Sequence, residues 1–256
     1  MDFPKRSFRS DCRIPDQSFT VIMKIIAGLL CFVYFLLPGK KPEAAEVGPI
    51  KGLVQRLDLR KNKWEKVRRG DSILKGDRIR TARNSRVELV FKNKIYLRAS
   101  ANSEINVRNL FGDTKEQDLD VNLIRGTLWT SALRKLKIKS RVKIRTPVAV
   151  MAVKGTQFNT VFQPENEQLE IIVVKGRVEV LPPFRIDGPG KIQGPKEILG
   201  PREITREEWM AQVSSGEILI LNRRDEKPII GMAGPDQLGN DWILFNRERD
   251  RILINR

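Results

Sequence analysis

The stretch from Lys135 to Arg145 constrains the fold of this chain more than any other. It reads Lys-Leu-Lys-Ile-Lys-Ser-Arg-Val-Lys-Ile-Arg, with basic residues at every odd position and mostly apolar residues at the even positions. Successive side chains of a β-strand point to opposite faces of the sheet, so strict alternation predicts a strand. We expect the side chains of the even-numbered face to pack into the core: Leu136, Ile138, Val142 and Ile144.

The odd-numbered face predicts a candidate anion-binding or partner-binding surface, called here the basic row. Its members are Lys135, Lys137, Lys139, Arg141, Lys143 and Arg145. The strand rise places these like charges about 6 to 7 Å apart, and no acidic residue lies between Asp120 and Glu165 to neutralise them within the sequence. Two interpretations remain open: a surface for anionic partners, or a solvated sheet face whose charge discourages edge-to-edge aggregation.

Short strands separated by turn residues continue from Val47 to Leu181. The run Arg86–Phe91 alternates, and the pairs Gly70-Asp71 and Gly76-Asp77 are typical of tight turns. These patterns predict an all-β domain, a sandwich or roll of short antiparallel strands. We expect the glycines at 126, 155 and 176 to mark bulges or bends with positive φ, because each follows a strand-like run.

Composition restricts the function classes. The chain has no histidine, which excludes Ser-His-Asp catalysis and histidine-ligated metal sites, and its two cysteines are Cys12 and Cys31. We therefore predict a protein without catalysis, metal or cofactor, and an enzyme acting on envelope glycans is the distant alternative. The net charge of +17 and the isoelectric point of about 10.2 favour anionic partners.

The N-terminal segment predicts export. Residues 21–37 are apolar apart from Lys24, and the thirteen residues after it suit a signal-peptide core better than a spanning helix of about twenty. We expect residues 1–45 to be a signal peptide or membrane anchor, with mature protein beginning between Lys40 and Gly48. Met23-Lys24 resembles a natural start, which would make residues 1–22 an over-extended gene start.

Export predicts a location in the periplasm or cell envelope, and the alternative to a cleaved signal peptide is an inner-membrane anchor formed by residues 21–37. That location argues against nucleic acid as the anionic partner. The predicted partners are therefore an envelope protein or an anionic envelope polymer, such as lipopolysaccharide or an acidic glycan.

The last third of the chain predicts a small α+β extension. Residues 182–202 are rich in Pro and Gly and predict a linker between a β domain at 46–181 and an extension at 203–256. Thr205 and Glu208 form a capping-box pattern, which predicts a helix from about 205 to 214. Short strands are expected at 217–221, 242–245 and 252–254.

An ordered series of motifs between about 50 and 181 resembles the FecR family domain, the periplasmic ferric-citrate-regulator-like module. The series comprises Trp64, Gly70-Asp71, Gly76-Asp77, Ile79–Thr81, Asn84–Leu89, Leu97-Arg98, Arg125–Trp129, Thr146–Ala149, Val153–Phe158 and Lys175–Val180. The resemblance implies an all-β, non-catalytic, exported domain. In the best-known members it relays a signal from an outer-membrane receptor, through an inner-membrane helix, to a sigma factor.

This chain departs from that scheme at its N-terminal side. The best-known regulators carry a cytoplasmic sigma-binding region before the membrane helix, whereas at most about twenty residues precede the apolar run here, without an amphipathic helical pattern. The leading hypothesis is therefore an exported binding or signalling scaffold. The alternative is a membrane-anchored signal relay that couples an outer-membrane receptor to a sigma factor.

Overall fold

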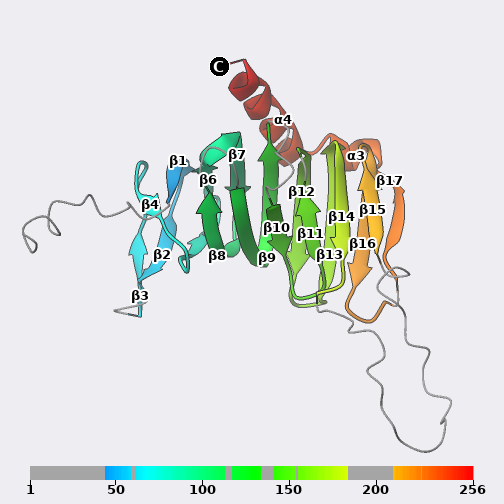
Figure 1. Cartoon of the computed structure of the whole chain (residues 1–256), viewed down its shortest axis with the longest axis horizontal. Helices are drawn as coiled ribbons and strands as arrows, with labels where there is room; N and C mark the ends of the chain where they lie inside the picture. The colour runs from blue at the N-terminus through cyan, green and yellow to red at the C-terminus, as the bar shows by residue number, and fades with distance from the viewer. Residues whose placement is uncertain are drawn as a thin grey trace, which may run out of the picture. The chain divides into compact units, whose positions relative to one another are not determined.

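The computed structural model describes one β-rich unit of the chain (Figure 1). The described residues are 44–58, 62–112, 117–133, 141–153, 155–183, 210–225 and 227–255. They belong to the second of two compact units, residues 43–256. The predicted apolar segment 21–37 and residues 184–202 of the predicted linker 182–202 lie outside them. No helix in the described part of the chain is long and apolar enough to cross a membrane.

Strand pairing produces two sheets that share one long strand. Sheet A has the order β4–β1–β6–β7–β9–β12–β13–β16–β17. Its members are β4 (Ser72–Ile73), β1 (Ala45–Lys51), β6 (Arg86–Phe91), β7 (Ile95–Ala99), β9 (Gln117–Ala132), β12 (Gln157–Gln163), β13 (Gln168–Lys175), β16 (Glu217–Asn222) and β17 (Ile229–Met232). A short 3-10 turn, η1 (Lys92–Lys94), joins β6 to β7.

Sheet B has the order β3–β2–β5–β8–β9–β10–β11–β14–β15. Besides β9, its members are β3 (Lys63–Lys66), β2 (Val54–Asp58), β5 (Arg78–Thr81), β8 (Glu104–Gly112), β10 (Arg141–Arg145), β11 (Val150–Val153), β14 (Arg177–Leu181) and β15 (Ala211–Ser214). The pairings between neighbours are antiparallel except that of β10 with β9, which is parallel. The predicted all-β class is therefore confirmed.

Strand β9 passes from one sheet to the other near Gly126. Its first part pairs with β8 and β10 in sheet B, and the part from Gly126 onward pairs with β12 and β7 in sheet A. Gly126 has φ +89°, and a Cβ atom there would overlap Ser103. Glycine is required because the crossing needs both a left-handed backbone and close contact with Ser103, the residue before β8.

Inward-facing side chains of both sheets form one hydrophobic core. The part of the basic row that the structure describes follows the predicted alternation, because Val142 and Ile144 are buried on the core side of β10. The predicted positive φ is also confirmed at Gly155 (+70°) and Gly176 (+88°).

The predicted turn roles of two aspartates are confirmed as well. The Oδ2 atoms of Asp71 and Asp77 each accept a backbone hydrogen bond, from Arg68 and Leu74 respectively, at 2.8 Å. These bonds close the two tight turns at Gly70 and Gly76, so both carboxylates serve the local backbone.

The C-terminal segment continues both sheets and then forms two helices. Strand β15 pairs with β14, and β16 pairs with β13, so the strand predicted at 217–221 is confirmed. The helices are α3 (Pro235–Leu238) and α4 (Asp241–Ile254). Helix α4 lies against the outer face of sheet A, where Ile243 packs with Trp129, Ile172 and Ile218 (Figure 1).

Three secondary-structure predictions for this segment are wrong. A helix was predicted from about 205 to 214, but residues 211–214 form strand β15. The predicted start of this helix at 205 lies outside the described residues. The strands predicted at 242–245 and 252–254 both fall inside α4. The buried stripe of α4 is Ile243, Asn246, Asp250 and Leu253, and its two polar members hide the helical period.

Candidate functional site

The basic row is only partly within the described residues. Lys135, Lys137 and Lys139 lie outside them, whereas Arg141, Lys143 and Arg145 lie on β10. The side chain of Arg141 is 67% exposed and that of Arg145 is 26% exposed. The row, as far as it is described, therefore faces solvent from the outer side of sheet B.

Both arginines of the described part of the row have acidic neighbours on β9, which are distant in the sequence. Parallel pairing places Arg141 beside Asp118 and Lys143 beside Asp120. An Arg141 Nη2 donor lies 3.4 Å from Asp118, and Arg145 Nε donates to both oxygens of Asp120 at 2.8 Å. Part of the charge is thus neutralised across the sheet, and anion binding by the row stays a prediction.

A shallow hollow adjoins the described part of the row. It has a volume of about 260 Å³ and is lined by Arg141, Lys143, Arg177, Glu179 and neighbouring side chains of β11 and β15. Three of these four charged residues are cationic, so the hollow is compatible with the anionic partners predicted for the basic row.

Helix α4 and the outer face of sheet A enclose a second cluster of charges, called here the α4 network. The helix begins at Asn240, whose side-chain oxygen accepts a hydrogen bond from the Ile243 backbone at 2.9 Å. This start places Asn246 and Asp250 on the face that meets the sheet, where both are fully buried.

Arg98 on β7 lies at the centre of the α4 network. Its Nε donates to Glu88 Oε2 at 2.6 Å, and its Nη1 lies 2.7 Å from Asp250 Oδ1 and 3.2 Å from Asn246 Oδ1. Only 2% of the Arg98 side chain is exposed. A buried guanidinium needs such partners, because removing an unpaired charge from water is costly.

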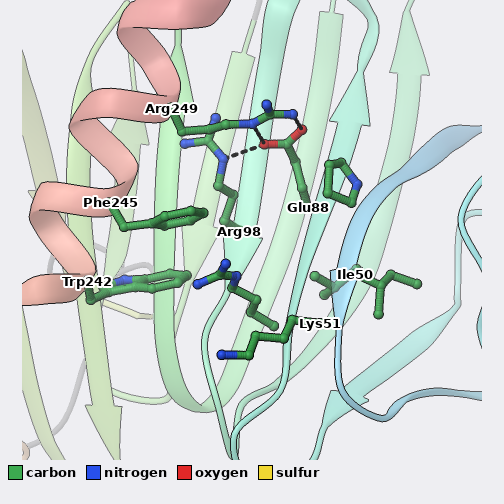
Figure 2. A pocket seen from close by; sticks show the side chains of 10 residues that line it. Ile50, Lys51, Glu88, Arg98, Trp242, Phe245 and Arg249 are labelled. Carbon is green, nitrogen blue, oxygen red and sulfur yellow. Dashed lines mark hydrogen bonds and ion pairs between the residues drawn. The ribbon is translucent and has the colours of Figure 1, made fainter.

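Glu88 on β6 receives a second arginine from the helix. Arg249 donates to both Glu88 oxygens at 3.1 Å (Figure 2). Burial alone would raise the pKa of Glu88, but the hydrogen bonds and charges of Arg249 and Arg98 outweigh burial and hold this pKa below its ordinary value. Glu88 therefore stays ionised at neutral pH.

Tryptophan side chains complete the attachment of α4. Trp129 is fully buried and its Nε1 donates to Asp250 Oδ2 at 3.0 Å. Trp242 donates from Nε1 to Asn159 on β12, also at 3.0 Å. Glu88 and Asp250 balance the charges of Arg98 and Arg249, and contacts from β6, β7, β9 and β12 of sheet A hold the helix.

A pocket opens beside the α4 network, between α4 and strands β1 and β6. Its volume is about 180 Å³. Figure 2 shows Trp242 and Phe245 projecting from the helix toward Ile50 and Lys51 on β1. The two rings are stacked, with centroids 5.9 Å apart. The remaining lining residues are Pro49, Arg86, Val87, Glu88, Arg98 and Arg249.

The sequence pattern did not predict this pocket or the α4 network. Glu88 and Arg98 fall on the polar positions of alternating strands, which is the pattern of a solvated sheet face. One signal was present: Asn240 before Asp241, followed by Ile243, is typical of a helix start. Nothing local, however, indicates which sheet positions such a helix covers.

The large aromatic side chains differ in burial. Trp129 and Phe158 are fully buried. Trp64 is half-buried, and the Arg80 guanidinium lies 4.0 Å from its ring centroid. Trp209 lies outside the described residues.

Thr146 and Thr156 are both buried in the fold. Thr146 Oγ1 accepts from the Ala149 backbone at 3.1 Å, which closes the turn after β10, and Thr156 is fully buried. In the part of the chain that the structure describes, no group of three or more Cys, Asp or Glu side chains is placed to hold a metal ion.

Comparison with known proteins identifies the central part of the chain. Residues 77–179 match the family model described as FecR protein, so the predicted resemblance to the FecR family domain is confirmed over this segment. This segment includes β6, β7 and β9, and thus the sheet residues of the α4 network. No curated protein matches the chain at a significant level.

Solved structures offer a more distant likeness. Two crystal structures of a "putative anti-sigma factor" from Parabacteroides distasonis ATCC 8503 are similar to this chain, each with 14% sequence identity and a TM-score of 0.45. The match covers 63% of this chain and 62% of that protein. The chain therefore spans less than two thirds of the length of those structures.

Proposed function

We propose that this chain is a non-catalytic, exported FecR-domain protein that acts as a binding or signalling scaffold in the cell envelope. The FecR domain at residues 77–179 is the observation that carries the proposal, because it supports a signalling or regulatory role. The predicted export segment supports the envelope location.

The chemistry of the α4 network supports binding over catalysis. A general acid or base must be free to exchange a proton with a substrate. Glu88 and Asp250 instead hold Arg98 and Arg249, and these contacts fix the helix to the sheet. The most deeply buried carboxylates near the pocket are therefore assigned a structural role.

The basic row supports an anionic partner. Exposed cations attract acidic surfaces and polymers over long distances, and Arg141 stays 67% exposed despite its contact with Asp118. The expected partners are an envelope protein, including an outer-membrane receptor, or an anionic polymer such as lipopolysaccharide or an acidic glycan.

Capture experiments with the full chain test this function. The tagged protein should fractionate with the envelope and retain an envelope component at low salt. A variant in which Lys137, Lys139, Arg141 and Lys143 are changed to glutamine should retain less, while its melting temperature stays nearly unchanged. Cytosolic recovery would refute export, equal capture by the variant would refute the role of the row, and capture of a sigma factor would favour the membrane relay.

A further inference from the structure

We propose that the pocket beside α4 is a binding site for a compact anion, a carboxylate or phosphate group carried on an apolar body of about one ring. This site is separate from the basic row, because its residues belong to β1, β6, β7 and α4, whereas the row lies on β10. The inference goes beyond the scaffold function and does not require export.

Two cations at the pocket face each other across a strand pair. Lys51 on β1 and Arg86 on β6 are directly opposite in the antiparallel register, and both line the pocket. Directly opposed residues have Cβ atoms about 5 Å apart, and like charges in this arrangement are destabilising. A bound anion would relieve this repulsion.

The described residues provide neither cation with a carboxylate partner. The Arg86 guanidinium lies 4.1 Å from the Phe245 ring centroid, which holds its position without neutralising its charge. Glu88 also lines the pocket, but Arg98 and Arg249 already occupy both of its oxygens. The pocket therefore has a net positive charge from Lys51 and Arg86.

An anion in the pocket would supply acceptor oxygens to Lys51 and Arg86. Charge-assisted hydrogen bonds from ammonium and guanidinium groups to a carboxylate or phosphate are stronger than hydrogen bonds between neutral groups. Two cations without carboxylate partners therefore favour a ligand with a carboxylate or phosphate group.

Size and lining indicate what carries the anion. An apolar cavity of about 150 Å³ holds one benzene molecule, and the pocket measures about 180 Å³. Pro49, Ile50, Trp242 and Phe245 provide apolar walls. A bare inorganic ion would leave these walls uncovered, so the fitting ligand combines a charged group with one ring-sized apolar part.

Titration of the full-length protein with benzoate, phenyl phosphate and neutral benzamide tests the site. We expect both anions to bind and benzamide to bind at least tenfold more weakly, since it lacks the charge. A preference between the two anions identifies carboxylate or phosphate as the natural group. Equal binding of benzamide, or binding of none of the three, would overturn the proposal.

Matched variants assign the binding to these residues. The variant K51Q/R86Q should lower benzoate and phenyl phosphate affinity at least tenfold, while the control K75Q/R83Q, which removes the same charges from two exposed positions, should not. Equal loss in both would mean nonspecific attraction and would refute the site. The conservative variant R86K should retain part of the affinity, because it keeps the positive charge.

Discussion

The outer face of sheet B and the outer face of sheet A both carry arginine–carboxylate pairs, but in different surroundings. On sheet B, Arg141 and Arg145 meet Asp118 and Asp120 in contact with solvent. On sheet A, Arg98 meets Glu88 and Asp250 beneath α4, where these side chains are at most 6% exposed. The same chemistry therefore has different energetic consequences, because water screens the first set and has been removed from the second.

The comparison also separates the two candidate sites. Charges on sheet B remain accessible and can exchange their partners for a ligand. Most charges beneath α4 are already matched, so recognition there depends on Lys51 and Arg86, which lie outside the α4 network. Breaking each set of contacts in turn measures this difference.

The largest expected effect is that of replacing Arg98 by methionine. This change leaves Glu88 and Asp250 with less compensating charge in a buried place, and breaking a buried pair costs about 3 to 5 kcal/mol. Chemical denaturation should report that loss. The matched change Arg145→Met on sheet B should cost about 1 kcal/mol or less. Equal losses would mean that burial beneath α4 does not strengthen these contacts.

Acid should weaken the sheet A contacts through Glu88. Its pKa is lowered in the folded protein, so its contribution is fully present above the unfolded value near 4.5 and is lost as the pH falls through the lower, folded value. We expect the free energy of unfolding to decline below about pH 4.5. The variant E88Q should show a shallower decline in this range, and an unchanged slope would remove Glu88 from this role.

Removing the helix cap should have an intermediate effect. Asn240→Ala deletes the acceptor of the Ile243 backbone hydrogen bond, and the loss of such a cap costs about 0.5 to 2 kcal/mol. Hydrogen exchange should show faster opening of α4, while the amides of sheet B keep their protection. Uniform loss of protection would mean that α4 and the sheets unfold as one unit.

The smallest effect is expected for the partly exposed pair of Arg145 and Asp120 on sheet B. Arg145→Gln removes the contact with Asp120 and should cost about 0.2 to 1 kcal/mol at low salt. The loss should shrink further at high ionic strength, because charges in contact with solvent are screened. Thermal melts at two salt concentrations measure it, with Arg98→Met as the comparison that salt should alter little.

Local pattern predicted the strands of this fold better than its long-range contacts. Alternation placed Val142 and Ile144 in the core, and glycine at 126, 155 and 176 marked left-handed backbone positions. Both properties depend on neighbouring residues, which the sequence displays directly.

Partners across the sheets could not be predicted in the same way. The absence of acidic residues between Asp120 and Glu165 indicated an unneutralised basic row. Parallel pairing of β10 with β9, however, places Asp118 and Asp120 beside it. Likewise, α4 was not expected at its position because Asn246 and Asp250 occupy its buried face. Polar side chains can be buried only when they find hydrogen-bond or charge partners. Here those partners are distant in the sequence, and the register between strands determines which residues meet.

The position of α4 in chain order affects how the protein can be made. Asp250 bonds Trp129 across 121 residues, and Arg249 reaches Glu88 across 161 residues. A chain that emerges from the ribosome in sequence order has produced every described strand of both sheets before this helix is available. Until then Glu88 and Arg98 remain in water, and the apolar patch around Trp129 stays uncovered. Exposed apolar surface of this kind promotes aggregation, so attachment of α4 is the folding step that removes this risk.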